Sequence, residues 1–203
     1  MMETKGALGF LGLTRWWRED LAQSDRDAIE TCFRNIGVNP TYHLLESNIV
    51  DMGSTPSHFL ASIAVMLVSR SNADIGIRVF SHAISFARDE GEEFSVYRMQ
   101  IEAFYKRRAE PGFLDLTIAA CYRQIALNRK KVQTATIQAA EAKNVQMSGR
   151  FPHAGYRQLA IIFEKEGKLT DAIELCRQAI NEGWVGDYEK RLDRLIRKTN
   201  KKK

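Results

Sequence analysis

The sequence predicts an all-helical protein on three observations. Apolar residues recur every three or four positions through almost the whole chain, which is the period of an amphipathic helix. No stretch sustains the alternation of apolar and polar residues that indicates a strand. The chain has only four prolines, at positions 40, 56, 111 and 152, spaced so that they stand at helix edges, where proline is tolerated.

The elements follow in order between these edges. In the first half we expect helices over residues 10–22, 24–36, 42–48, 57–70, 73–89 and 92–108. Residues 113–147 are helical with a break near Asn128-Arg129, because an unbroken helix of that length is long for a compact domain. A helical hairpin follows over 153–184. The sequence thus predicts three regions: N-terminal helices packed on the rest in 1–50, hairpins in 51–186, and a basic capping helix and tail in 187–203.

Small and large residues alternate within the hairpin at fixed positions. Counting from His153, positions 4, 7, 8, 11, 15, 20, 24 and 27 hold Tyr156, Leu159, Ala160, Phe163, Gly167, Ala172, Cys176 and Ala179. This series resembles the tetratricopeptide repeat. A looser copy spans 57–90, where Leu60, Ile63, Ala64, Leu67, Gly76, Phe80 and Ala83 occupy corresponding positions. The resemblance implies stacked antiparallel hairpins forming an α-solenoid, although residues 91–152 depart from the pattern; an irregular helical bundle is the alternative.

The same resemblance implies where a partner would bind. Members of the family line a concave surface with positions 2, 5, 9 and 12 of the first helix. In the last copy these are Ala154, Arg157, Ile161 and Glu164, and in the first copy His58, Ala61, Val65 and Val68. The family's clamp for a peptide carboxylate needs Lys and Asn at positions 5 and 9, and neither copy has them. The apolar positions 61, 65 and 68 either receive a partner helix or are covered by the N-terminal helices.

Positive charge is concentrated at the C-terminal end. Residues 184–203 hold eight Lys or Arg against three Asp or Glu, so the net charge of +5 belongs to this segment and residues 1–183 sum to zero. In the helix that follows residue 187, the apolar face is expected to hold Tyr188, Leu192, Leu195, Ile196 and Thr199, and the polar face Lys190, Arg191, Arg194, Arg197 and Lys198. Such a helix can cap a stack of hairpins and offer cations to an acidic partner.

Residues suited to catalysis do not form a recognisable set. The sequence has no GxSxG, P-loop, GxGxxG or HExxH motif. His43 and Glu46 lie one helical turn apart, but no second pair completes a metal site. Cys32, Cys121 and Cys176 are odd in number and far apart, which favours neither disulfides nor zinc and indicates a reduced, cytoplasmic setting. We therefore expect no enzymatic activity, cofactor or metal.

Two classes of binding function remain. The first is a protein-interaction scaffold or adaptor that uses Arg157, Ile161, Glu164, Lys190, Arg191, Arg194 and Arg197. The alternative is an RNA-associated protein that uses the basic C-terminal helix and the aromatic and cationic segments 105–108 and 122–131. The longest apolar run, Phe59 to Val68, has ten residues, against the roughly 20 that cross a bilayer, so no membrane partner is expected. Homo-oligomerisation stays open.

Overall fold

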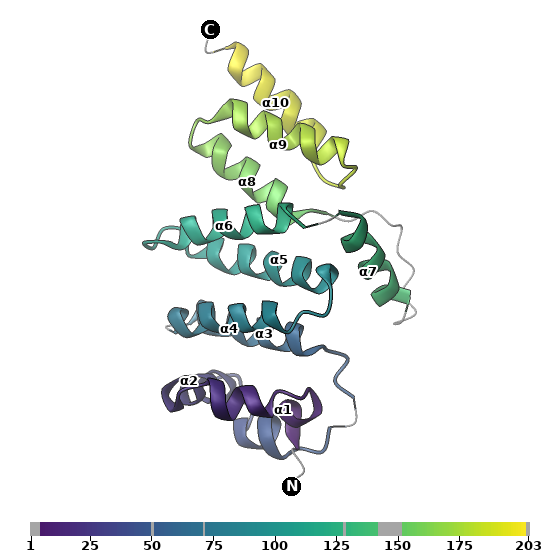
Figure 1. Ribbon diagram of the computed structural model, residues 1–203. Coiled ribbons are helices and arrows are strands. Elements are labelled where there is room, and N and C mark those ends of the chain that lie inside the picture. Colours follow the sequence, from purple (N-terminus) through teal and green to yellow (C-terminus); the bar gives the residue numbers. More distant parts are fainter. Residues whose placement is uncertain (1–4, 50, 71, 128, 142–151, 202–203) are drawn as a thin grey trace. The chain divides into compact units, whose positions relative to one another are not determined.

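The fold is all-helical, as the sequence predicts (Figure 1). The computed structural model describes residues 5–49, 51–70, 72–127, 129–141 and 152–201, and within these ranges the only extended pairing is one bridge between Pro152 and Val185. None of the helices described is long and apolar enough to cross a bilayer.

The chain divides into two compact units, Met1–Arg88 and Asp89–Lys203. This boundary differs from the three predicted regions, 1–50, 51–186 and 187–203. The N-terminal helices share a unit with the first predicted hairpin, and the C-terminal helix shares a unit with the last one. The reason is burial: both end segments cover the apolar surface of a neighbouring helix pair.

Four α-helices and two short π-helices are found among the described residues of the first unit. They are α1 (Gly6–Phe10), η1 (Trp16–Asp20), α2 (Gln23–Arg34), η2 (Tyr42–Glu46), α3 (Pro56–Ser69) and α4 (Ala73–Ser85). The helix expected over residues 10–22 is two short helices, because α1 ends at Phe10 and Gly12 follows with a φ of 69°, a left-handed conformation that suits glycine. Helix α4 stops at Ser85, four residues before the predicted end.

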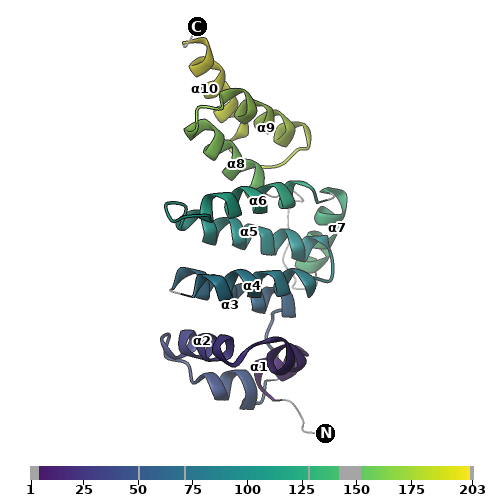
Figure 2. The same ribbon diagram turned by 60° about the vertical axis from the view of Figure 1, so that its left-hand side comes forward.

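Helices α3 and α4 run side by side in opposite directions (Figures 1 and 2). Their backbones approach closely at Gly76, where an added Cβ would lie 2.7 Å from Val68 Cγ2 and 2.9 Å from the Ala64 carbonyl oxygen. The Ser57 hydroxyl donates a 2.7 Å hydrogen bond to the Ala83 carbonyl oxygen across the same pair. A small residue at position 76 is therefore a condition for this packing.

The N-terminal helices pack on this pair. Trp16 is 1% exposed, and its ring meets the ring of His82 in α4 edge to face with centroids 5.9 Å apart. Asp25 in α2 accepts two hydrogen bonds from the Arg78 guanidinium of α4, at 2.8 and 2.9 Å. Of the apolar positions on α3 for which the sequence left two alternatives open, Ala61 and Val68 are buried and Val65 is partly exposed, and α2 contacts this helix.

In the part of the second unit that the structure describes there are six helices. They are α5 (Glu90–Lys106), α6 (Phe113–Ile125), α7 (Arg129–Glu141), α8 (Ala154–Lys165), α9 (Leu169–Asn181) and α10 (Tyr188–Asn200). The break expected near Asn128-Arg129 is confirmed as the gap between α6 and α7. Helices α5 and α6 form one antiparallel pair and α8 and α9 another, while α7 lies against α5 (Figures 1 and 2). The end of the helix expected up to residue 147 lies outside the described residues.

A buried glutamine joins three of these helices. The Gln124 amide in α6 donates a 2.8 Å hydrogen bond to the Phe94 carbonyl oxygen of α5, and its side-chain oxygen accepts one of 2.6 Å from the backbone N–H of Gly155 at the start of α8. Gly155 has little room for a side chain, because an added Cβ would lie 2.8 Å from the Cys121 carbonyl oxygen. The first turn of α8 is thus held directly against α6.

The α8–α9 pair packs through the alanines that the repeat pattern singles out. Ala160 and Ala172 are fully buried, as is Ala64 in the first unit. Gly167 forms the turn between the helices with a φ of 77°. Helix α10 then covers α9 and buries Tyr188 and Leu195, so the amphipathic C-terminal helix is confirmed.

Replacing Gly76 with alanine tests the close approach. In an unhindered helix this change stabilises by about 1 kcal/mol. Here the new methyl group meets the α3 backbone, so we expect urea denaturation to show a loss of about 1 to 3 kcal/mol. Ser81→Ala, at an exposed position of the same helix, is the control and should change stability by less than about 0.5 kcal/mol. Stabilisation by Gly76→Ala would contradict the packing described here.

Candidate functional site: the charged surface of α8 and α10

Helix α10 begins against the start of α8. His153 precedes α8, and its Nδ1 accepts a 3.2 Å hydrogen bond from the Tyr156 backbone N–H. The Tyr188 hydroxyl in the first turn of α10 donates to the His153 carbonyl oxygen at 2.9 Å. Because both contacts are buried, they fix the first turn of α10 against the start of α8, and charged side chains of the two helices meet at Glu164.

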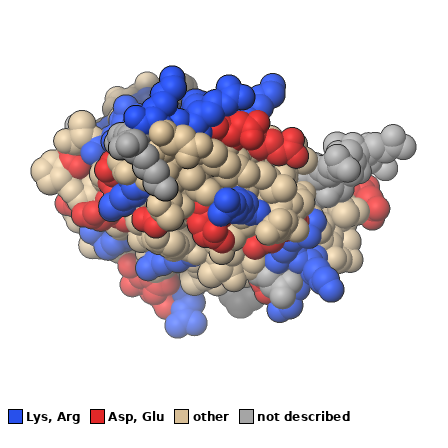
Figure 3. Space-filling view, turned by 90° about the horizontal axis from the view of Figure 1, so that it is seen from above, with Lys and Arg blue, Asp and Glu red and all other residues tan. Residues whose placement is uncertain are grey.

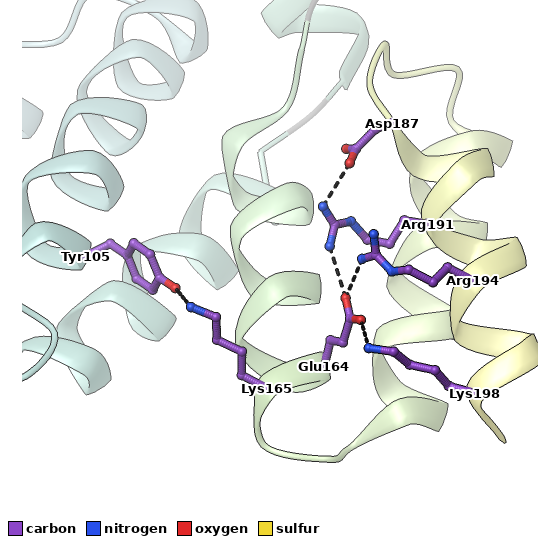
Figure 4. A network of polar contacts seen from close by, with 7 residues as sticks. All are labelled: Tyr105, Glu164, Lys165, Asp187, Arg191, Arg194 and Lys198. Atoms are coloured by element: carbon purple, nitrogen blue, oxygen red, sulfur yellow. Dashed lines mark hydrogen bonds and ion pairs between the residues drawn. The ribbon is translucent and has the colours of Figure 1, made fainter. Parts of the chain in front are cut away.

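Glu164 is the centre of the charged contacts between these helices (Figure 4). Its Oε2 accepts hydrogen bonds from Arg191 at 3.2 Å and from Arg194 at 2.6 Å, and its Oε1 accepts one from Lys198. Only 12% of the Glu164 side chain is exposed, so these ion pairs are partly shielded from water. Glu164 was predicted as a residue for a partner; the structure shows that it already holds three cations of its own chain.

The pKa of Glu164 is lowered from its ordinary value. Burial by itself would raise the pKa, but the hydrogen bonds and charges of Lys198 and Arg194 outweigh burial by favouring the carboxylate. Glu164 therefore stays ionised under mildly acidic conditions, and the link between α8 and α10 persists with it.

Arg191 does not lie on the polar face where the sequence places it. The residue is 7% exposed, and its guanidinium lies between Glu164 and Asp187, whose Oδ2 is 2.8 Å from Nη2. The helical period assigns Arg191 to the charged side, but its two carboxylate partners lie on the side that faces α8. Arg191 therefore stabilises the fold, and its guanidinium is not accessible to a partner.

Three exposed cations, Lys190 and Arg197 in α10 and Lys201 directly after it, lie outside the Glu164 network. Lys190, Arg197 and Lys201 form no ion pair with any other described residue, and they line a shallow hollow together with Asp193, Arg194 and Lys198. Figure 3, which looks at the molecule from its C-terminal end, shows Lys and Arg atoms in a run along one edge, with Asp and Glu atoms beside them. The prediction missed Lys201, although it continues the period of Lys190 and Arg197 by one more turn.

Two candidate residues lie on α8 itself. Arg157 is exposed and Ile161 is partly buried. They precede Glu164 by seven and three residues, so they share one side of the helix with it. Arg157 is thus available to a partner, whereas Ile161 offers a limited apolar area.

The segment 105–108, predicted as an aromatic and cationic site, is largely engaged within the unit. The Lys165 ammonium donates a 3.0 Å hydrogen bond to the Tyr105 hydroxyl, as Figure 4 shows, and Arg108 lies over the same ring with its Cζ 4.4 Å from the centroid. Burial would raise the pKa of Tyr105, but Lys165 outweighs it and lowers the pKa. Arg107 pairs with Glu110. The ring is therefore covered rather than open for stacking.

In the segment 122–131, some of the aromatic and cationic side chains are exposed and others contact the protein itself. Tyr122 is 50% exposed on α6, and Arg123 and Lys130 are exposed as well. Arg129 lies over the Trp184 ring with its Cζ 5.8 Å from the centroid, and Lys131 forms a 2.9 Å ion pair with Glu90. Asn128 lies outside the described residues. Half of the cations expected to face RNA thus contact the protein itself.

The described histidines and cysteines are packed as structural groups. The His43 ring lies against Phe33 with centroids 5.4 Å apart, and no cluster of three or more His, Cys, Asp or Glu side chains suited to a metal is found among the described residues. All three cysteines are buried, and burial raises the pKa of Cys121 to about 12 and of Cys176 to about 11. Thiols with such pKa values are protonated at neutral pH and make poor nucleophiles.

Neither a protein-family model, nor a curated protein, nor a solved structure matches this chain. The class of the protein is therefore defined by its own structure, which is all-helical with a charged surface on α8 and α10. The chemistry of that surface supplies the argument for function.

Replacing Glu164 with glutamine tests the centre of the network. The change leaves the Arg191 guanidinium buried with less compensating charge. We therefore expect the free energy of unfolding to fall by about 2 to 3 kcal/mol, which is somewhat less than the loss for a fully buried ion pair. Glu174→Gln is a matched control on α9, since its pair with Arg177 is exposed and 3.9 Å long, and should cost less than about 0.5 kcal/mol. Equal effects of the two changes in urea denaturation would refute a special role for Glu164.

The same pair of proteins yields a pH dependence. The pKa of Glu164 is lower in the folded state than the value of about 4.3 typical of an unfolded chain, so its stabilising contribution is complete above that pH and is lost as pH falls through the folded pKa. We expect the stability difference between the native protein and Glu164→Gln to be constant near neutral pH and to shrink below about pH 4. Urea denaturation along a pH series measures it; a difference that grows on acidification contradicts the assignment.

Proposed function

We propose that this protein is a non-enzymatic scaffold or adaptor that binds a protein partner through the charged surface of α8 and α10. The observation that carries the proposal is the state of the α10 cations. Glu164 engages one edge of the helix, while Lys190, Arg197 and Lys201 stay exposed and outside ion pairs among the described residues. A surface of uncompensated charge at a helix held firmly by the fold favours recognition of an oppositely charged partner.

The helix pairs support a repeat of the tetratricopeptide type as the framework. The alanines at the matched positions, Ala64, Ala160 and Ala172, are buried between helices, which is what such a repeat requires. Helix α10 has the properties of a cap, since it covers α9 with Tyr188 and Leu195 and presents charge to water. Proteins of this architecture present extended binding surfaces instead of closed reaction clefts.

The state of the ionisable groups supports a role without catalysis. Burial lowers the pKa of His153 to about 4, so this histidine is neutral at neutral pH and is too weakly basic to accept a proton readily. The buried thiols are protonated for the reason given above. Reduced cysteines also fit a cytoplasmic protein, and we place it there.

RNA binding is the second candidate, and one observation favours it. Tyr122 exposes half of its surface beside the exposed Arg123, a combination that can stack on a base and contact a phosphate. Binding of this kind weakens steeply with salt because each neutralised phosphate releases counterions. The engagement of Tyr105, Arg108 and Lys131 within the unit reduces the area available for it.

Reversing the charge of Arg157 tests the proposed scaffold. We expect Arg157→Glu to reduce capture of the partner by tagged protein about fivefold or more, because like charges then face each other across the interface. The measurement is quantitative mass spectrometry of captured protein from a nuclease-treated lysate, with circular dichroism to verify folding.

Arg177→Glu supplies the control, because Arg177 is also an exposed arginine and lies on α9. It should leave capture unchanged. Equal capture by both variants would exclude the α8 surface, and loss of all captured protein on nuclease treatment would favour the RNA-binding alternative.

A further inference from the structure

Four cations form a single row along the outer side of α10 and its C-terminal cap residue, Lys201. Lys190, Arg194, Arg197 and Lys201 follow one another at intervals of four, three and four residues. This spacing keeps side chains on one side of a helix, and the rise of about 1.5 Å per residue separates neighbours by roughly 4.5 to 6 Å along the axis. All four line the same shallow hollow. We call them the outer row.

The inner edge of α10 shows what such cations accept. Arg194, which also belongs to the outer row, and Lys198, one turn further on, hold the two oxygens of one carboxylate that α8 supplies. Lys190, Arg197 and Lys201 are cations as well, at intervals of seven and four residues, but none of them forms an ion pair with a described carboxylate. The outer side of α10 thus repeats the arrangement of the inner edge without its acidic helix.

We propose that the outer row docks an acidic α-helix of the partner protein, with carboxylates repeating at intervals of four and three residues. The proposal deepens the scaffold function and rests on it. A second helix lying along α10 takes the position opposite α8, and its Asp or Glu side chains complete the ion pairs that Glu164 completes on the inner edge. A helix is the element whose own period matches the row over its full length.

Two features of α10 favour an acidic helix over nucleic acid. Asp193 lies in the hollow among the cations, where it repels a uniformly negative phosphate backbone but pairs with a basic residue of a protein helix. The aromatic residue of α10, Tyr188, is 2% exposed, so the helix offers no ring on which a base could stack. Asp193 therefore also sets the register of the docked helix.

Synthetic peptides test the spacing directly. The matched peptide is a helix with Glu at positions i, i+4, i+7 and i+11 and one Lys placed to face Asp193; its isomer has the same composition with the acids spread around the helix. We expect the full-length protein to bind the matched peptide about tenfold more tightly in fluorescence anisotropy at roughly 0.15 M salt. Equal affinities for the two peptides would overturn the proposal.

Two triple variants locate the site. Lys190→Gln with Arg197→Gln and Lys201→Gln removes three cations of the outer row and spares the contacts of Glu164, so we expect affinity for the matched peptide to fall about tenfold. Lys106→Gln with Arg123→Gln and Lys130→Gln removes the same charge from exposed positions elsewhere and should weaken binding less than about twofold. Similar losses in both variants would mean general attraction of charge and contradict the docking site.

Two further outcomes separate this proposal from the scaffold function. If the protein binds a single-stranded RNA more tightly than the matched peptide, and the Lys190→Gln, Arg197→Gln, Lys201→Gln variant loses this binding, the outer row is assigned to nucleic acid. Capture of the cellular partner that survives the outer-row variant but is lost in Arg157→Glu would overturn docking on α10 and leave the scaffold intact. Loss of capture in the outer-row variant, with the peptide preference above, supports both.

Discussion

The close approach of helix backbones at small residues is the constraint on which the structure depends. Gly76 lets α4 lie against α3, and Ala160 and Ala172 are buried in the pairing of α8 with α9. A side chain of ordinary size at Gly76 would separate the helices and expose the apolar residues between them. The side-chain contacts of Glu164, Gln124 and Tyr188 each join neighbouring helices, so the positions of these three residues depend on how the helices pack.

Helix α10 shows how one amphipathic helix serves two purposes. Its apolar residues and the buried Arg191 fix it to α8 and α9, while Lys190, Arg197 and Lys201 remain outside the fold's own ion pairs among the described residues. Glu164 accounts for this difference, because it forms ion pairs with Arg191, Arg194 and Lys198 and with no other cation of the helix among the described residues. A helix anchored in this way keeps its remaining charges in a defined arrangement, which reduces the entropy lost when a partner binds.

The distribution of chemistry also bears on function. Groups that often act in catalysis, such as His153 and the three thiols, are buried and have pKa values moved away from neutrality or into the protonated form. The exposed groups are mainly charged side chains at helical spacing. Under the scaffold function that we propose, specificity for a partner lies in the order of charges along α10.

The sequence by itself determined the all-helical class, the break between α6 and α7, the buried alanines and the amphipathic α10, because each depends on local period or on residue size. It misplaced Arg191 and treated Glu164, Tyr105 and Lys131 as available to partners. Those assignments depend on which charged groups meet across neighbouring helices, and helical period carries no information about the opposing surface. Only the tertiary structure decided them, because an ion pair between residues 27 to 41 positions apart forms where packing brings two side chains within about 3 Å.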